Sequence, residues 1–145
     1  MLFRSVCFIM PIQKRQLGDI GEGYAVNFLK QKGYKILARN WRRHNCGEID
    51  IVTAKTSGLL GKIKSVIFVE VKTIKGLGSN FEAAIAAQNV HYQKQQKLLK
   101  TAKIFLAQNK IAPDIPWQID VIVVALNPDR GLVKIEHLEN VVWGR

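Results

Sequence analysis

The sequence has few of the residues from which disulfide scaffolds and zinc sites are built. Its 145 residues include two cysteines, Cys7 and Cys46, and three histidines. The cysteines lie far apart in the chain, and none of these residues shows the spacing typical of a zinc site. We therefore expect both cysteines to be reduced thiols and the protein to be cytoplasmic.

Long apolar runs are also absent. Residues 1–10 contain an apolar segment that is too short to span a membrane and lacks the cleavage site of a signal peptide. We expect residues 1–13 to be a disordered tail, or a segment preceding a true start at Met10, and we expect no membrane partner. Residues 14–145 contain no internal repeat, linker or low-complexity stretch, which predicts a single domain.

Acidic residues are scarce beside basic ones. The chain has 22 Lys and Arg against 11 Asp and Glu, a net charge of +11, and a pI near 9.9. Such a charge is typical of domains that bind nucleic acid through its phosphates. Ribosomal proteins and proteins at anionic membranes share it, so the charge indicates a class of partner and not a function.

Two predicted β-strands carry acids at alternate positions. In residues 47–52, Glu48 and Asp50 are expected to share one face of the strand, because successive side chains point to opposite faces. Ile49 and Ile51 are expected on the other face. In the second strand, residues 65–73, the same alternation places Glu70 and Lys72 on one face with Phe68.

Polar residues and two glycines at 55–62 predict a hairpin loop between these strands. If the hairpin is symmetric about residue 60, Asp50 lies opposite Glu70, with Cβ atoms roughly 4.5–5.5 Å apart. Carboxylates that close repel unless a cation, most naturally a divalent metal, lies between them. Lys72 would then reach a water or phosphate oxygen beside the metal. The alternative is that all three are solvated residues on an outer sheet face.

A helix is predicted over residues 14–32, where apolar residues recur at helical spacing before Gly33. Glu22 falls at the edge of the apolar stripe, and the small residues Gly18 and Gly21 would let the helix approach the sheet. Glu22 is therefore a candidate to face the acids of the strands. A solvated boundary glutamate is the alternative.

Candidate phosphate-binding residues lie in three segments. A first strand at 34–41 leads into a basic cluster around Trp41, whose indole is suited to stacking on a base. A glycine-containing basic loop follows at 73–80, and a helix from about 91 to 109 carries a row of lysines. The candidates are Arg39, Arg42, Arg43, Lys75, Lys94 and Lys97. The alternatives are a solvated edge strand with a core tryptophan and a solvated helix face.

The remaining elements are a short helix at 81–87, an apolar strand at 117–126 and a final strand at 132–138. Asp120 interrupts the apolar strand and must find a partner, either a site lysine or a backbone donor. The order of helix, three strands, helix and two strands predicts an α/β domain with a mixed central sheet.

The stretch Gly47-Glu48-Ile49-Asp50 followed by Phe68-Val69-Glu70-Val71-Lys72 resembles the PD-(D/E)xK nuclease superfamily, and within it the YraN-like family. Similar residues at Gly21–Glu22, Asn40–Arg42, Lys94 and Ile119–Val121 extend the resemblance over roughly residues 14–143. It implies a restriction-endonuclease-like fold, a mixed sheet flanked by helices, similar to archaeal Holliday junction resolvases.

The resemblance also implies an activity, the metal-dependent hydrolysis of phosphodiester bonds in DNA, including branched or structured DNA. Asp50 and Glu70 would hold Mg²⁺ or Mn²⁺ with Glu22, the helical acid of the superfamily, and Lys72 would orient the attacking water. Resolvases act as two-fold dimers, so the analogy extends to a homodimer. Lys94 matches a lysine of the family near the sheet.

Two other functions are open on the sequence alone. One is a nucleic-acid-binding protein without turnover, and the other is an RNA-processing or ribosome-associated factor. The resemblance favours DNA over RNA as the partner.

Overall fold

The computed structural model describes residues 13–76, 81–84, 92–127, 129 and 131–141. The predicted tail therefore lies, apart from residue 13, outside the described residues. None of the described helices is long and apolar enough to cross a membrane.

The order of elements is the predicted one. Helix α1 is followed by three strands, helix α3 and two further strands. Their bounds are α1 Lys14–Gln31, β1 Lys35–Arg43, β2 Gly47–Ser57, β3 Lys62–Lys75, α3 Tyr92–Gln108, β4 Trp117–Asn127 and β5 Gly131–Leu138. Residues 81–84 form a helical turn inside the predicted helix 81–87, whose last residues lie outside the described part.

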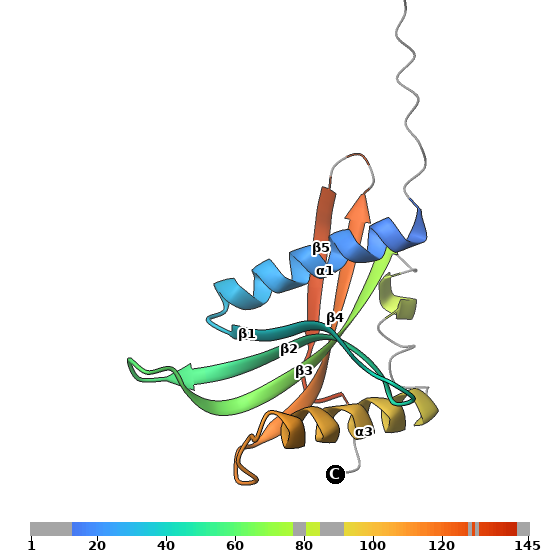
Figure 1. The fold of residues 1–145 in the computed structure, drawn as a ribbon. Helices are drawn as coiled ribbons and strands as arrows, with labels where there is room; N and C mark the ends of the chain where they lie inside the picture. Colours follow the sequence, from blue (N-terminus) through green and yellow to red (C-terminus); the bar gives the residue numbers. More distant parts are fainter. Residues whose placement is uncertain (1–12, 77–80, 85–91, 128, 130, 142–145) are drawn as a thin grey trace, which may run out of the picture.

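A five-stranded sheet in the order β1-β2-β3-β4-β5 forms the centre of the molecule. All neighbouring strands are antiparallel except β3 and β4, which are parallel and are joined by a connection that includes α3. Helices α1 and α3 lie on opposite sides of the sheet (Figure 1). This mixed α/β architecture is consistent with the restriction-endonuclease-like fold.

Each helix packs its apolar stripe on one face of the sheet. On the α1 side, Leu29 and Ala25 are buried in one cluster with Ile51 and Val69. On the α3 side, the ring of Phe105 lies edge-on to Phe68 and Trp41, with ring centroids 5.7 and 5.2 Å apart. Because both faces are covered, the central strands are apolar on both sides, as their sequences indicated.

The register of the β2–β3 hairpin confirms the predicted symmetry about residue 60. The pairs run from Ile51↔Val69 to Lys55↔Ser65, where a bulge interrupts them. Strand pairing continues to Ser57↔Lys62, so the loop is much shorter than the predicted 55–62.

The prediction that Ile49 and Ile51 share a face is wrong. Ile51 is buried on the α1 side of the sheet, whereas Ile49 is buried on the α3 side. The paired strand explains the change, because Asn40, between the partners of these two residues, has a left-handed backbone with φ of 48°. The local kink rotates the end of the β1–β2 pair, and simple alternation fails there.

Alternation also fails earlier in β1. Ile36 packs on the α1 side, but Leu37, Ala38 and Trp41 all pack on the α3 side. The register shifts between Ile36 and Ala38, and this bulge turns Ala38 to the side of Leu37. Trp41 lies on that side again because the left-handed Asn40 interrupts alternation a second time.

Helix α1 approaches β3 closely at Gly21. A Cβ atom built on Gly21 would lie 1.9 Å from Oγ1 of Thr73, whereas one on Gly23 would meet nothing within 4 Å. The missing side chain at Gly21 therefore sets the height of α1 above the sheet, and with it the position of Glu22.

We expect Gly21→Ala to destabilise the protein by about 1–3 kcal/mol, because a methyl group forces α1 and β3 apart. The matched change Gly23→Ala is expected to stabilise the protein by up to about 1 kcal/mol, since alanine has a higher helix propensity than glycine and its methyl group would meet no neighbour. Urea unfolding followed by circular dichroism measures both. Equal effects of the two substitutions would contradict the close approach.

Candidate active site

The site lies where β2 and β3 separate. Pairing between these strands begins at Ile51↔Val69, so residues 47–50 of β2 pair only with β1. Beyond Val69, β3 pairs only with β4. The two strands thus form a fork, and Asp50 is the first residue of β2 inside it.

Asp50 is held in the fork by a backbone hydrogen bond. The N–H of Val71 donates to Oδ2 of Asp50 at 2.7 Å. Had the strands stayed paired in the same register, Val71 would face the backbone of Ile49. The carboxylate therefore takes the place of a lost backbone acceptor, which fixes one oxygen and leaves the other for the site.

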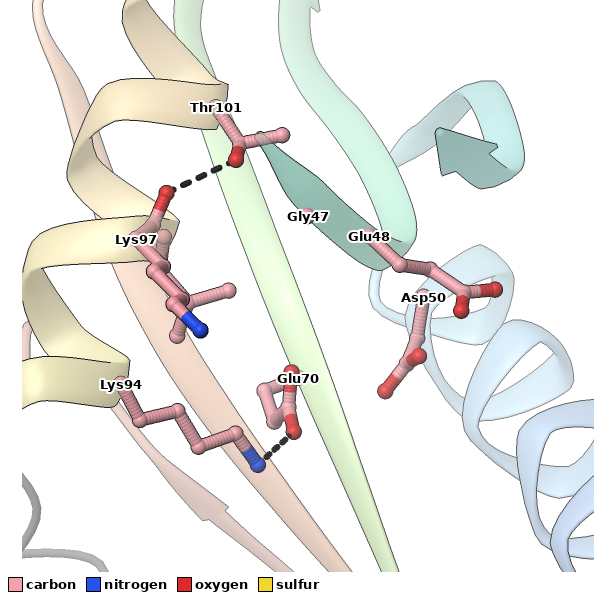
Figure 2. A pocket seen from close by; sticks show the side chains of 8 residues that line it. Gly47, Glu48, Asp50, Glu70, Lys94, Lys97 and Thr101 are labelled. Atoms are coloured by element: carbon pink, nitrogen blue, oxygen red, sulfur yellow. Dashed lines mark hydrogen bonds and ion pairs between the residues drawn. The ribbon is translucent and has the colours of Figure 1, made fainter. Parts of the chain in front are cut away.

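Two cavities meet at Asp50. The first, of about 260 Å³, opens toward α3 (Figure 2). Its lining residues are Gly47, Glu48, Asp50, Glu70, Lys94, Lys97, Leu98 and Thr101. The second, of about 460 Å³, opens toward α1. Its lining residues are Arg15, Gly18, Asp19, Glu22, Asn40, Arg42, Glu48 and Asp50. Asp50 and Glu48 line both, so these two acids stand between the cavity that contains Glu70 and the cavity that contains Glu22.

Burial and like charge act together on Asp50. Its pKa is raised from 3.8 to about 7, first by removal from water and then by the negative charge of Glu70. Glu22 and Glu48 add smaller effects in the same direction, and the Val71 hydrogen bond opposes them. A carboxylate in this position is stabilised by any cation that enters the fork.

Glu22 faces the same region from α1. Burial raises its pKa, and the side chain of Asn40 and the charge of Arg39 partly offset that effect. Asp19 and Glu48 raise the pKa of Glu22 further. The small residues of α1 thus bring Glu22 to the sheet, as its place at the edge of the apolar stripe predicted.

Lys94 reaches the acids from α3. Its ammonium group forms an ion pair with Oε1 of Glu70 (Figure 2). The Glu70 side chain is only 15% exposed, whereas that of Lys94 is 55% exposed. Lys94 was predicted as a phosphate-binding residue and, by the resemblance, as a lysine near the sheet; its contact with Glu70 links it directly to the acidic site.

A buried threonine fixes α3 beside the acidic strand. The Oγ1 atom of Thr101 lies 2.7 Å from the carbonyl oxygen of Lys97 and 3.1 Å from that of Cys46. Gly47 has a φ of 131°, and a Cβ atom built on it would lie 3.2 Å from Oγ1 of Thr101. Gly47 therefore serves both the turn before β2 and the close packing of α3.

Of the other predicted residues, Arg42 and Lys97 each line one cavity, whereas the lining of neither cavity includes Lys72, Arg39, Arg43 or Lys75. Lys72 is exposed two residues after Glu70 on β3, and in the described part of the chain it has no ion pair. Arg42 binds Glu48 at 2.8 Å and lines the cavity on the α1 side. Lys97 lines the other cavity. Arg43 and Lys75 are exposed at the ends of β1 and β3.

The described residues contain no group of three or more His, Cys, Asp or Glu side chains arranged to hold a metal ion. Glu22 and Glu70 line different cavities, with Asp50 common to the region. The donor types nevertheless suit Mg²⁺ or Mn²⁺, which prefer carboxylate oxygens and water. The pKa of Asp50 is raised mainly by burial and then by the charge of Glu70, and a bound cation would oppose both effects.

Two residues lie outside the site, in the core of the protein. Trp41 is half-buried against Phe105, so its indole is part of the core and not a free stacking surface. Asp120 is fully buried and accepts hydrogen bonds from Gln118 Nε2 and the backbone N–H of Asn140, each at 2.8 Å.

Asp120 also lies 2.8 Å from Nε2 of His137. The predicted backbone donor is thus present, but histidine and glutamine take the place of the proposed site lysine. His137 stands seventeen residues away on another strand, and no local pattern in the sequence connects the two.

Comparison with known proteins gives a consistent family match. Residues 21–124 match the family described as "Uncharacterised protein family UPF0102". A UPF0102 protein of Roseiflexus castenholzii is 36% identical over 129 residues, which cover 89% of this chain and 94% of the relative. UPF0102 protein TTE1452 of Caldanaerobacter subterraneus is 34% identical over 130 residues, 89% and 96% of the two chains. A UPF0102 protein of Treponema pallidum is 37% identical over 130 residues, 89% and 94% of the two chains.

The raised pKa of Asp50 predicts a pH-dependent stability in metal-free buffer. An unfolded carboxyl ionises near 3.8, but the folded one ionises near 7, so the folded state binds more protons in between and loses stability as the pH rises. Asp50→Asn removes this pH-dependent loss of stability and keeps a side-chain oxygen that can accept the hydrogen bond from the Val71 N–H. We expect the variant to become progressively more stable than the wild type from about pH 4 to about pH 7, with a constant difference above.

Urea unfolding in the presence of chelator, repeated across this pH range, measures the difference. A difference that does not change with pH would show that Asp50 ionises normally in the folded protein.

Proposed function

The chain belongs to the uncharacterised protein family UPF0102, and we propose that it is a metal-dependent endonuclease of the PD-(D/E)xK superfamily that hydrolyses phosphodiester bonds in DNA, including branched or structured DNA. The observation that carries the proposal is the carboxylate of Asp50. It is partly buried inside a strand fork, among other acids, in a protein of net charge +11.

The hydrogen bond from Val71 accounts for one oxygen of Asp50 but not for the neighbouring acids. Carboxylates of like charge that are partly withdrawn from water lower the stability of a folded protein. Acids gathered in a cleft, one of them with a perturbed pKa, are a common feature of sites that take up a cation. Asp50 and Glu70 would hold Mg²⁺ or Mn²⁺, and Glu22 would bind a second ion or a metal-bound water. The metal would polarise the scissile phosphate and lower the pKa of a bound water.

The chain's own residues take complementary roles. Lys72 follows Glu70 on the same strand and is exposed, so its ammonium group is free to orient the attacking water and to offset charge on the phosphate. Lys97 and Arg42 line the two cavities and are placed to bind phosphates on either side of Asp50. Arg39, Arg43 and Lys75 extend this basic rim along the strand ends.

Lys94 has a more specific role in the proposal. Its ion pair with Glu70 compensates one carboxylate while no substrate is bound. If Glu70 instead held a metal ion, Lys94 would be available to a phosphate oxygen. Transfer of the Lys94 ammonium group from the carboxylate of Glu70 to a phosphate of DNA would couple metal binding to DNA binding.

A second function is favoured by the same ion pairs. Glu70 is bound by Lys94 and Glu48 by Arg42, and a site whose acids are paired internally also suits a nucleic-acid-binding protein without turnover. Such a protein would bind DNA or RNA with a strong dependence on salt and would not cleave either.

We expect the purified protein to cleave labelled DNA in the presence of Mg²⁺ or Mn²⁺, and we expect cleavage to stop when chelator is added. Four-way junction and duplex DNA, single-stranded DNA and a structured RNA are compared under the same conditions. Asp50→Asn should abolish cleavage, and Lys72→Ala should lower its rate by about 10²- to 10³-fold. Asp114→Asn, which changes an exposed acid before β4, is the matched control and should cleave normally.

Binding of all these nucleic acids without cleavage by the wild type would support the non-catalytic function. Full activity of Lys72→Ala would remove that residue from the mechanism.

Metal binding is expected to be measurable without activity. Mn²⁺ should raise the thermal midpoint of the wild type, because an ion that binds only the folded state stabilises it. Asp50→Asn should lose this shift and Asp114→Asn should keep it. Lys94→Gln should bind Mn²⁺ more tightly, since it frees Glu70. An equal shift in all variants would place the metal elsewhere.

A further inference from the structure

The hairpin that joins β2 to β3 extends beyond the rest of the sheet. Pairing of β2 with β1 ends at Ala54, and pairing of β3 with β4 begins at Val66. Residues 55–65 are therefore a two-stranded ribbon that pairs with no further strand in the described part of the chain. Figure 1 shows it projecting past the ends of both helices. We call residues 55–65 the arm.

The tip of the arm presents two adjacent leucines to solvent. Leu59 is 108% exposed and Leu60 is 99% exposed. They occupy the corners of a turn closed by the N–H of Gly61, which donates to the carbonyl oxygen of Gly58 at 3.1 Å. Both glycines have positive φ, 72° and 62°, so the turn holds the two leucines outward at the end of a paired ribbon.

Such a tip indicates a binding surface. Single exposed leucines are common on soluble proteins, but two neighbouring ones at a projecting end add apolar area that no fold contact requires. The glycines on either side supply the turn. Polar residues at the two corner positions would allow the same turn to form, so the leucines are not needed for folding.

The charge of the arm identifies the chemistry of its partner. Residues 51–69 include three lysines, Lys55, Lys62 and Lys64, and no Asp or Glu. All three lysines are exposed. A basic ribbon with an apolar tip complements a polymer whose phosphates lie outside and whose bases lie inside. A two-stranded ribbon also fits a DNA groove.

We propose that the arm binds DNA, with its lysines on phosphates and with Leu59 and Leu60 inserted between neighbouring bases. Apolar side chains used in this way unstack a base step and bend the duplex. Unstacking is easiest where pairing is already broken, so the arm favours branched, nicked or mismatched DNA. The inference rests on the proposed nuclease function, for which it supplies the preference for structured substrates.

The position of the arm relates the inserted step to the cleaved phosphate. Gly58 follows Asp50 by eight residues of extended strand, which span about 26 Å. That length corresponds to about eight base pairs of B-DNA. The leucines therefore reach a base step no more than about eight base pairs from the phosphate at Asp50.

The test measures unstacking separately from cleavage. The wild type and the double variant Leu59→Ala/Leu60→Ala are mixed, in chelator, with a four-way junction and a linear duplex that carry 2-aminopurine near the branch or at the same step. We expect the wild type to raise the fluorescence of the junction. The double variant should fail to do so and should bind the junction at least about tenfold more weakly.

Two controls separate the arm from general effects. Leu132→Ala removes an exposed leucine from β5, 40% exposed, and should behave as the wild type. Circular dichroism and thermal unfolding of the double variant should match the wild type, since its leucines make no core contact. Lys62→Gln/Lys64→Gln should lower the salt dependence of junction binding, because fewer counterions are released.

Equal unstacking and binding by the wild type and the double variant would overturn the proposal. It would also be overturned if the leucines were needed only for binding to vesicles of phosphatidylglycerol and phosphatidylcholine, or only for self-association in sedimentation. Leucine-dependent unstacking without cleavage in Mg²⁺ would retain the arm and reject the nuclease. Equal cleavage of junction and duplex by both proteins, without unstacking, would retain the nuclease and reject the arm.

Discussion

The fork between β2 and β3 is the constraint on which the site depends. Two strands that pair from Ile51↔Val69 onward separate on one side of that pair, and Asp50 fills the gap by accepting a hydrogen bond from the Val71 N–H. The fork removes Asp50 from water and at the same time brings β1, β3 and α1 around it. Its raised pKa is a consequence of this strand geometry, and the cavities toward α1 and α3 are the space that the separated strands leave.

Both helices are positioned to serve the fork. Gly21 lets α1 lie against Thr73, which brings Glu22 to the acidic strand. Thr101 ties α3 to the carbonyl oxygen of Cys46, one residue before Gly47, and so places Lys94 within reach of Glu70. Helix α1 thus contributes an acid and α3 a lysine to the acidic strands, which suits a site where a cation and a phosphate must be bound next to each other.

Much of the architecture could be predicted because it depends on local pattern. The helical spacing of Leu17 to Leu29 predicted α1 within one residue of its observed end, and the symmetry of the hairpin predicted the pairing from Ile51↔Val69 to Lys55↔Ser65. The predicted pair of Asp50 with Glu70 is not part of this pairing, because the strands separate before it. Alternation failed at Ile49 and Ile51 because the cause lies in the neighbouring strand, at Asn40. The partner of Asp120 was missed for the same reason, since His137 belongs to β5.

The sequence by itself determined the order of elements, the excess of positive charge and the residue types near the site, because periodicity, composition and short motifs are properties of the chain alone. Only the tertiary structure decided which carboxylate loses its solvent, that Lys94 binds Glu70, that Trp41 belongs to the core and that Leu59 and Leu60 stand fully exposed. Burial and pairing are set by contacts between residues far apart in the chain, such as Asp50 with Val71, and these contacts exist only once the strands and helices have packed.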